Sequence, residues 1–174
     1  MLDGPTGAPV LALPSSLGTT PELWAENMPF WTGPFRVLRF DQRGHGGSEA
    51  PPGPYSLGDL GRDFMGLLDE LELERVTLCG LSLGGATAMW VAAEAPERID
   101  RLILACTSAR FGEPAQWLER AETVRSAGLE AIAEKVVARW FTDDIRLETV
   151  VAFRNLLVST PAEGYAGSCE ALAG

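Results

Sequence analysis

The sequence is poor in histidine, in cysteine and in long apolar segments. It has one histidine, His45, and three cysteines in 174 residues. No apolar run approaches the roughly 18 residues that a membrane-spanning helix needs, which argues against membrane insertion. Three cysteines cannot all pair within one chain, and none has the spacing of a metal-binding pair. The cysteines therefore predict neither a full set of disulfides nor a metal site. Cys79 and Cys106 end apolar segments and are expected to be buried core thiols.

Basic residues are also few. The chain has 14 lysines and arginines against 24 acidic residues, and a formal net charge of −10. Phosphate binding needs a clustered basic face, and the basic residues here are dispersed, which argues against nucleic acid as a partner. The first residues, Met1 to Pro5, lack the charged and apolar regions of a signal peptide. We therefore predict a cytoplasmic, acidic enzyme that acts on a small molecule.

Short apolar segments alternate with longer helical patterns along the first two thirds of the chain. The apolar segments predict buried strands at Val10 to Leu13, Arg36 to Phe40, Arg75 to Cys79 and Arg101 to Ala105. Helices are predicted at Ser56 to Leu71, with Ser56 as the cap, and at Leu83 to Ala95. Parallel strands need connections long enough to hold a helix, so the predicted fold class is α/β, a doubly wound parallel sheet.

The pattern changes after Ser108. Trp117 to Phe141 and Ile145 to Val158 are predicted to be helices, and no further strand is expected before Gly174. We predict that residues 1–108 form the N-terminal part of the α/β core and that residues 109–174 form a partial helical cap, or lid, at the C-terminus.

The pentapeptide Gly80-Leu81-Ser82-Leu83-Gly84 matches the G-x-S-x-G motif between a predicted strand and a predicted helix. Such a sharp turn exposes the serine oxygen above the sheet and needs small residues on both sides, which Gly80 and Gly84 supply. The motif predicts Ser82 as a nucleophile, with the N–H of Leu83 directed at the oxyanion that forms on attack. The alternative is a glycine-rich turn with no catalytic role.

A second oxyanion donor is expected from the loop that follows the first predicted strand, at Ser15 to Thr20. The position of this loop puts the N–H of Leu17 in the required neighbourhood. The alternative is an ordinary turn rich in serine, glycine and threonine.

Several segments together resemble one family. They are Pro14 to Thr20 with Trp24, Phe40 to Ser48, Cys79 to Gly85, Ala95 to Arg98, Ala109 to Gly112 and Arg139 to Thr142. The D-x-R-G-x-G-x-S segment at 41–48 and the nucleophile segment are shared by many α/β-hydrolases, whereas Ser-Leu-Gly-Thr-Thr at 16–20 discriminates more finely. On these residues the chain resembles the 3-oxoadipate enol-lactonases of the α/β-hydrolase superfamily along nearly its whole length.

The resemblance implies a serine hydrolase that opens a small carboxylate-bearing enol-lactone to 3-oxoadipate through an acyl-enzyme. It also implies a place in the breakdown of protocatechuate and catechol, and no metal or organic cofactor. Because such a substrate carries a carboxylate, a cationic cap residue would help to hold it, and Arg139 beside Trp140 is the candidate. The alternative for Arg139 is a solvated helix arginine.

In this superfamily an acid and a histidine follow the serine along the chain, and neither is identified here. His45 precedes Ser82 in a segment that resembles a structural loop of the family. Asp143 and Asp144 follow Ser82 but lie in the predicted cap with no strand before them. The resemblance therefore implies an N-terminal part only, with an incomplete sheet, as a truncated product, a frameshift or half of a split enzyme would give. We expect little turnover by this polypeptide alone.

Two other functions stay open. One is a different α/β-hydrolase activity, such as a general carboxylesterase, and the other is a catalytically inactive scaffold or binding module that keeps the pocket. An incomplete sheet with an unpaired edge would favour self-association or binding of a complementing C-terminal fragment. The expected ligand of the pocket is a small lactone or ester.

Overall fold

A five-stranded sheet runs through the middle of the structure, a computed structural model that describes residues 1–174. The strands are β1 (Leu2–Asp3), β2 (Val10–Ala12), β3 (Arg36–Leu38), β4 (Val76–Leu81) and β5 (Ile99–Ala105). They lie in the order β1-β3-β2-β4-β5, and all neighbours are parallel except β1, which runs antiparallel to β3. Each of the four predicted strands is present within two residues of its predicted bounds, and β1 is an addition.

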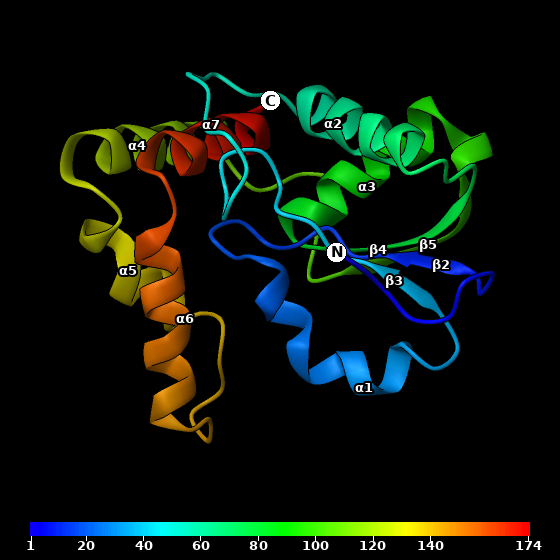
Figure 1. The fold of residues 1–174 in the computed structure, drawn as a ribbon. Helices are drawn as coiled ribbons and strands as arrows, with labels where there is room; N and C mark the ends of the chain where they lie inside the picture. The colour runs from blue at the N-terminus through cyan, green and yellow to red at the C-terminus, as the bar shows by residue number, and fades with distance from the viewer.

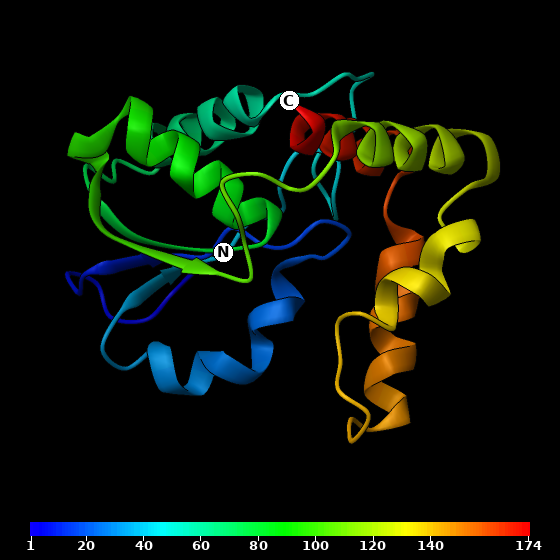
Figure 2. The same cartoon turned by 180° about the vertical axis from the view of Figure 1, so that it is seen from behind.

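Helices cover both faces of the sheet. The α-helices are α1 (Met28–Trp31), α2 (Leu57–Glu70), α3 (Leu83–Glu94), α4 (Pro114–Ala127), α5 (Glu130–Val137), α6 (Leu147–Ser159) and α7 (Ala162–Ala173), with 3-10 turns at Pro21–Asn27 and Pro96–Arg98. In Figure 1, α2 and α3 lie above the sheet and α1 lies below it, and Figure 2 shows the same layers from behind. The predicted doubly wound α/β class is confirmed. None of the helices combines the length and the apolar character that crossing a membrane requires.

The start of α2 shows how the sequence sets a helix boundary. The Ser56 hydroxyl accepts a hydrogen bond from the N–H of Asp59 at 3.1 Å, and the Asp59 carboxylate accepts one from the N–H of Ser56 at 2.8 Å. This reciprocal pair satisfies two backbone donors that a helix N-terminus otherwise leaves free. Behind it Leu60, Phe64 and Leu68 follow the helical period and are buried on one face.

The strand β5 differs from the prediction of a buried segment. It pairs only with β4, so it is the edge of the sheet. Leu102, Ile103 and Leu104 are 38%, 47% and 43% exposed. An apolar run of this length predicts a strand correctly, but it does not reveal whether another strand lies beyond it.

The chain after β5 is helical, as predicted, but it is divided differently. The single helix predicted over Trp117 to Phe141 is two helices, α4 and α5, because Gly128 adopts a φ of +75° at the end of α4. The helix α7 lies in the segment predicted as helical cap, but the sequence pattern indicates no separate bounds for it. Its sequence is rich in alanine and glycine and has no apolar stripe, so packing against the rest of the chain must stabilise it.

Close backbone contacts fix α7 to the loops beside it. A Cβ added to Gly164 would lie 2.1 Å from the carbonyl oxygen of Gly44, and one added to Gly167 would lie 2.7 Å from the ring of Tyr55. Only glycine permits either approach. The neighbouring α4 is joined to α7 by Arg125, which forms ion pairs with Glu163 and Glu170 of α7.

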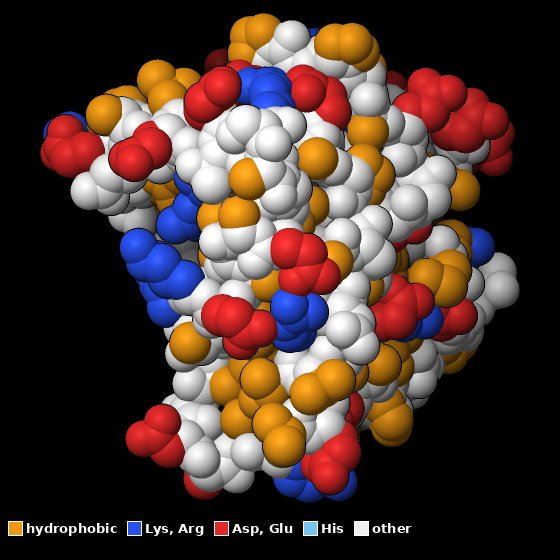
Figure 3. Space-filling view, turned by 90° about the vertical axis from the view of Figure 1, so that its left-hand side faces the viewer, with side chains coloured by type: hydrophobic (Ala, Val, Ile, Leu, Met, Phe, Trp, Pro, Cys, Tyr) orange, Lys and Arg blue, Asp and Glu red, His pale blue; other side chains and the backbone are white.

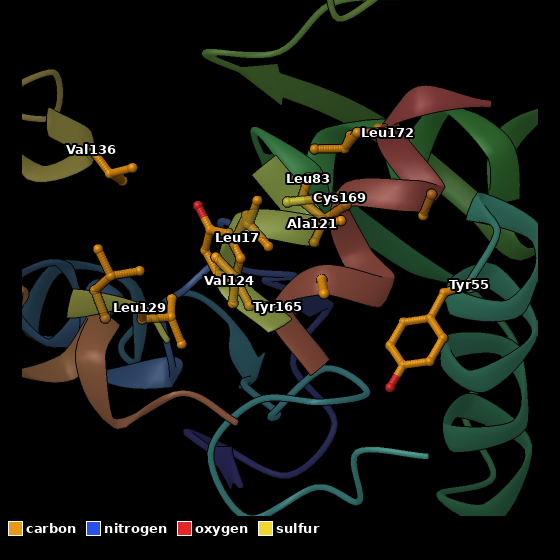
Figure 4. Close-up of a cluster of buried hydrophobic side chains, with 14 of the residues drawn as sticks. Leu17, Tyr55, Leu83, Ala121, Val124, Leu129, Val136, Tyr165, Cys169 and Leu172 are labelled. Carbon is orange, nitrogen blue, oxygen red and sulfur yellow. The ribbon is translucent and has the colours of Figure 1, made fainter. Parts of the chain in front are cut away.

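One buried cluster ties the helices α4 to α7 to the sheet region. It includes Leu17 and Leu83 from before residue 108, and Val124, Leu157 and Tyr165 from after it. In Figure 4, Leu17, Val124 and Tyr165 lie close together. The division into two parts at residue 108 stays a prediction, since this cluster draws on both.

Candidate functional site

The strand order positions the candidate site. The strands β2 and β4 are neighbours in the middle of the sheet. After β2 the chain continues to β3 on one side, and after β4 it continues to β5 on the other side. In sheets of this type, ligands bind beyond the carboxyl ends of the strands where the order reverses in this way. A cavity of about 450 Å³ lies there and is lined by Ser16 and Leu17, which follow β2, and by Ser82, which follows β4. The structure thus brings the predicted nucleophile and the predicted oxyanion loop to one cavity.

Ser82 lies on a strained turn. Its φ is +54° and its ψ is −112°, a conformation that costs a non-glycine residue about 1–3 kcal/mol. Its N–H donates to the carbonyl of Ala105 at 2.9 Å, and its own carbonyl accepts from the Thr107 hydroxyl at 2.8 Å. Hydrogen bonds to the last residue of β5 and to Thr107 just after it therefore hold the turn that presents the Ser82 side chain to the cavity.

The two motif glycines make that turn possible. A Cβ on Gly80 would lie 2.3 Å from the carbonyl oxygen of Gly84, and a Cβ on Gly84 would lie 2.2 Å from the carbonyl oxygen of Pro14. Both distances are far inside van der Waals contact. The structure therefore gives the predicted reason for small residues at these positions.

The loop at Ser15 to Thr20 is held from several sides. The Ser15 hydroxyl accepts from the indole N–H of Trp24 at 3.1 Å, and the Ser15 carbonyl accepts from the Gln42 amide at 2.8 Å and from the N–H of Gly84 at 3.0 Å. The last bond joins this loop directly to the turn that carries Ser82. The sequence does not indicate this role for Gln42 or Ser15, because the two residues lie in distant segments and meet only in the fold.

The two predicted oxyanion donors, Leu17 and Leu83, lie in the two segments that the hydrogen bond between Ser15 and Gly84 joins. Leu17 lines the cavity, and its N–H makes no hydrogen bond within the protein. Leu83 is the first residue of α3, so its N–H has no acceptor four residues earlier in the helix. The structure leaves both N–H groups without an acceptor, but Leu83 is not among the residues that line the cavity, and the donor role of both groups stays a prediction.

His45 supports the loop and does not face the cavity. It is fully buried, its Nε2 accepts from the N–H of Gly18 at 2.9 Å, and its Nδ1 lies 3.0 Å from the carbonyl oxygen of Arg43. These partners fix the neutral tautomer with the proton on Nδ1. Burial lowers the pKa of His45, because the charged imidazolium loses its hydration there. These are the contacts of a structural residue next to Leu17.

The remaining walls of the cavity are aromatic and cationic. Arg139 and Trp140, the predicted cap residues, line it, and so do Arg120 and Lys135, which sequence reasoning missed. The other lining residues are Thr19, Leu23, Leu81, Cys106, Trp117, Val136, Phe141, Phe153 and Tyr165. No histidine, aspartate or glutamate belongs to the lining.

The predicted status of the cysteines holds only in part. Cys79 and Cys169 are buried, and burial raises the pKa of both thiols. Cys106 is exposed and lines the cavity, which contradicts its prediction as a buried core thiol. The reason is that β5 ends at Ala105 and Cys106 turns away from the strand with a φ of +44°.

The acidic residues Asp143 and Asp144 lie in the segment before α6 and outside the cavity lining. The Asp144 carboxylate accepts from the Thr142 hydroxyl at 2.5 Å, and this bond lowers the pKa of Asp144. Their exposure agrees with the interpretation of solvated acids.

Sequence and structure comparisons point to the same relatives. The curated 3-oxoadipate enol-lactonase 2 of Acinetobacter baylyi is 40% identical over 98% of this chain, and the 3-oxoadipate enol-lactonase 1 of that organism is 33% identical over 99%. Among solved structures, an enol-lactonase from Burkholderia xenovorans superposes with a TM-score of 0.96, at 42% identity, and the match covers 100% of this chain and 69% of that one. A hydrolase from Pseudomonas aeruginosa gives 0.95 at 45% identity, covering 99% and 67%.

The chain spans 65% of the length of each of the two curated enol-lactonases. The family model for the alpha/beta hydrolase fold matches residues 9–165. That range takes in the sheet from β2 to β5, the Ser82 turn, the loop at Leu17 and the helical segment as far as Tyr165. The chain therefore belongs to the α/β-hydrolase family, and along its whole length it is similar to 3-oxoadipate enol-lactonases.

Proposed function

We propose that this chain provides the nucleophile and the oxyanion hole of an enol-lactone hydrolase. In the proposal Ser82 attacks a small carboxylate-bearing enol-lactone, and the product is 3-oxoadipate, in the breakdown of aromatic compounds. The observation that supports it most is the union, in one cavity, of a strained serine, the loop with the free N–H of Leu17 and a cationic wall. Similarity to two enol-lactonases supports the choice of substrate.

The proposed reaction follows from this geometry. The Ser82 oxygen attacks the lactone carbonyl while its proton passes to a base, and the N–H groups of Leu17 and Leu83 stabilise the oxyanion. The ring C–O bond then breaks, the enol oxygen receives the proton, and the acyl group stays on Ser82. Water then cleaves the acyl-enzyme, which frees the second carboxylate and returns a proton to the Ser82 oxygen, and the released enol tautomerises to the ketone of 3-oxoadipate. Loss of one oxyanion donor typically slows such reactions about 10²- to 10³-fold.

Residues 1–174 offer Ser82 no base in the cavity. The lining has no histidine or acid, and both ring nitrogens of His45 have backbone partners. A serine without an adjacent base has the low reactivity of an ordinary alcohol. We therefore propose that Ser82 contributes no measurable ester turnover in these residues alone, and that an added base restores reaction at Ser82.

Exogenous imidazole tests this proposal. Hydrolysis of 4-nitrophenyl acetate is measured with wild type and with Ser82→Ala, and the Ser82→Ala rate is subtracted as the background catalysis by imidazole itself. We expect no difference between the two proteins without imidazole and a saturable excess rate for wild type with it. Equal rates at every imidazole concentration would remove Ser82 from the proposal. An excess without imidazole would show that the chain has a base of its own.

The substrate choice is tested in the same assay. An enol-lactone that bears a carboxylate is compared with a neutral lactone of similar size, and we expect the anionic one to react faster per molecule bound. Equal rates would favour a general carboxylesterase. Binding without any reaction at Ser82 would favour an inactive binding module.

A further inference from the structure

The cationic side chains of this protein fall into two groups. Eight arginines form ion pairs with carboxylates: Arg39, Arg43, Arg62, Arg75, Arg98, Arg110, Arg125 and Arg154. The other six of the 14 lysines and arginines form no ion pair with a carboxylate: Arg36, Arg101, Arg120, Lys135, Arg139 and Arg146. Half of this unpaired set lines the Ser82 cavity. In a chain with a net charge of −10, three cations without a carboxylate partner in one cavity indicate an anionic ligand.

The three cations are not equivalent. Arg120 is half-buried, whereas Lys135 and Arg139 are exposed. The guanidinium carbon of Arg120 lies 4.6 Å from the ring centroid of Trp117, and the indole N–H of Trp117 donates to the carbonyl of Phe111 at 2.6 Å. This stacking fixes the position of the Arg120 guanidinium and shields one of its faces from water. Of the three cations, Arg120 is therefore the least exposed and has the best-defined position.

Tyr165 brings two of the guanidinium groups together. Its side chain is 1% exposed and lines the cavity, and its hydroxyl donates no hydrogen bond within the protein. Burial raises the pKa of Tyr165, and the positive charges of Arg120 and Arg139 act against this rise. Both charges therefore act on the phenol oxygen, which stays protonated and keeps a free donor for a ligand.

We propose that Arg120, with Arg139 and the Tyr165 hydroxyl, anchors the substrate carboxylate and determines specificity for anionic substrates. That these residues anchor a substrate, and not another anion, rests on the proposed hydrolase function. A carboxylate oxygen accepts from both guanidinium groups and from the phenol, which are charge-assisted or buried hydrogen bonds. A neutral analogue leaves these donors without an acceptor, so it binds more weakly.

A binding experiment tests the anchor without any chemistry at Ser82. Glutarate and its neutral diamide, glutaramide, are titrated into the protein while the tryptophan fluorescence is recorded, since Trp117 and Trp140 line the cavity. We expect glutarate to bind, to bind more weakly as salt is added, and to bind far better than glutaramide. Arg120→Gln should weaken glutarate binding about tenfold or more, and Arg139→Gln and Tyr165→Phe by smaller factors.

Arg101→Gln is the matched control, because Arg101 is also unpaired but lies on β5 outside the cavity. It should leave glutarate binding unchanged. Wild-type affinity in Arg120→Gln, equal binding of glutaramide, or no saturable glutarate binding would each overturn the proposal. If Arg120→Gln fails to fold, as judged by circular dichroism, Tyr165→Phe and Arg139→Gln decide the question, and wild-type affinity in both overturns it.

The two proposals fail separately. In a Ser82→Ala background, glutarate binding should still depend on Arg120, since the anchor does not involve the serine oxygen. If glutarate binding depends on Arg120 but imidazole causes no reaction at Ser82, the anion site is supported and the proposed hydrolase function is overturned. Imidazole-dependent reaction without Arg120-dependent binding would keep the hydrolase and place the carboxylate elsewhere.

Discussion

At position 84 the packing leaves no room for a methyl group. A Cβ there would lie 2.2 Å from the carbonyl oxygen of Pro14 and 2.7 Å from that of Ser15, both backbone atoms that cannot move aside alone. We expect Gly84→Ala to lower the free energy of unfolding by about 1–3 kcal/mol, the usual cost of overpacking. Urea denaturation followed by circular dichroism measures this change.

Gly66→Ala provides the comparison for that substitution. Gly66 lies in the middle of α2, is exposed, and has open space where its Cβ would be. Because alanine restricts the unfolded chain and suits a helix, this change should raise the free energy of unfolding by about 0.5–1 kcal/mol. Equal losses in both variants would mean that the contact with Pro14 is not the cause at position 84.

The buried imidazole of His45 should make stability depend on pH near neutrality. Its pKa is lowered in the folded state, so between that value and about 6.5 the unfolded chain binds more protons than the folded one. Its contribution to stability is therefore complete above about pH 6.5 and is lost as the pH falls below it. Urea midpoints at pH 7.5 and 5.5 should differ more in wild type than in His45→Gln. An equal difference in both proteins would assign the pH dependence to other groups.

Among the elements, α4 and α7 are joined by one charged network. Arg125 binds Glu163 at 2.8 Å and Glu170 at 2.5 Å, and the bond to Arg125 is the main reason that the pKa of Glu163 falls to about 2. We expect Arg125→Gln to lower the free energy of unfolding at pH 7 by about 1 kcal/mol, a value reduced for the partial exposure of the pair. The loss should be visible as a lower urea midpoint.

The same pair has a defined pH window. A carboxylate with a lowered pKa stabilises the folded state above its unfolded value of about 4.5, and this stabilisation disappears as the pH falls toward 2. The difference between wild type and Arg125→Gln should therefore shrink on acidification. Arg154→Gln is the control, because its partners Glu130 and Glu134 are 61% and 82% exposed, and its effect should be smaller.

The elements that the sequence predicts well are those whose own residues determine them. The capping box at Ser56 and the apolar period behind it define α2 without help from the rest of the chain. The helix α7 is the opposite case, since its alanines and glycines carry no amphipathic pattern and are explained by contacts with other segments, among them Gly44 and Tyr55. The break at Gly128 could have been predicted, because glycine is the usual residue past a helix end.

For the molecule as a whole, the exposed edge of β5 should govern association. It is an unpaired strand with large apolar side chains, which is a template for pairing with another chain. We expect wild type to self-associate as its concentration rises, and Ile103→Lys to reduce this by placing a charge on the edge. Size-exclusion chromatography with light scattering measures both proteins.

Ile145→Lys is the control for the edge effect. Ile145 is also exposed, at 39%, but it precedes α6 and belongs to no strand. Figure 3 shows the helical side of the molecule, where hydrophobic side chains gather in the lower half, at the height of α6 in Figure 1. If Ile145→Lys reduces association as much as Ile103→Lys, this helical surface is responsible and not the sheet edge.

The candidate site, like the fold, can be predicted from the sequence only where residues close together in the chain determine it. Ser82, Gly80 and Gly84 could be placed from the sequence because one short motif contains their geometric relations. Arg120 and Tyr165 could not, since each reaches the cavity only through the packing of α4 and α7. Cys106 was misplaced because its backbone leaves the strand at that residue.

The contact between Gly44 and Gly164 has a consequence for how this chain can change over evolutionary time. Each glycine is required by the backbone of the other, so a side chain gained at either position meets main-chain atoms that no change at the partner position can remove. Substitution at the two positions is therefore blocked jointly, although they lie far apart in the sequence. Descendants that lose either glycine must first move α7 away from the 41–48 loop, and with it Tyr165 from the cavity.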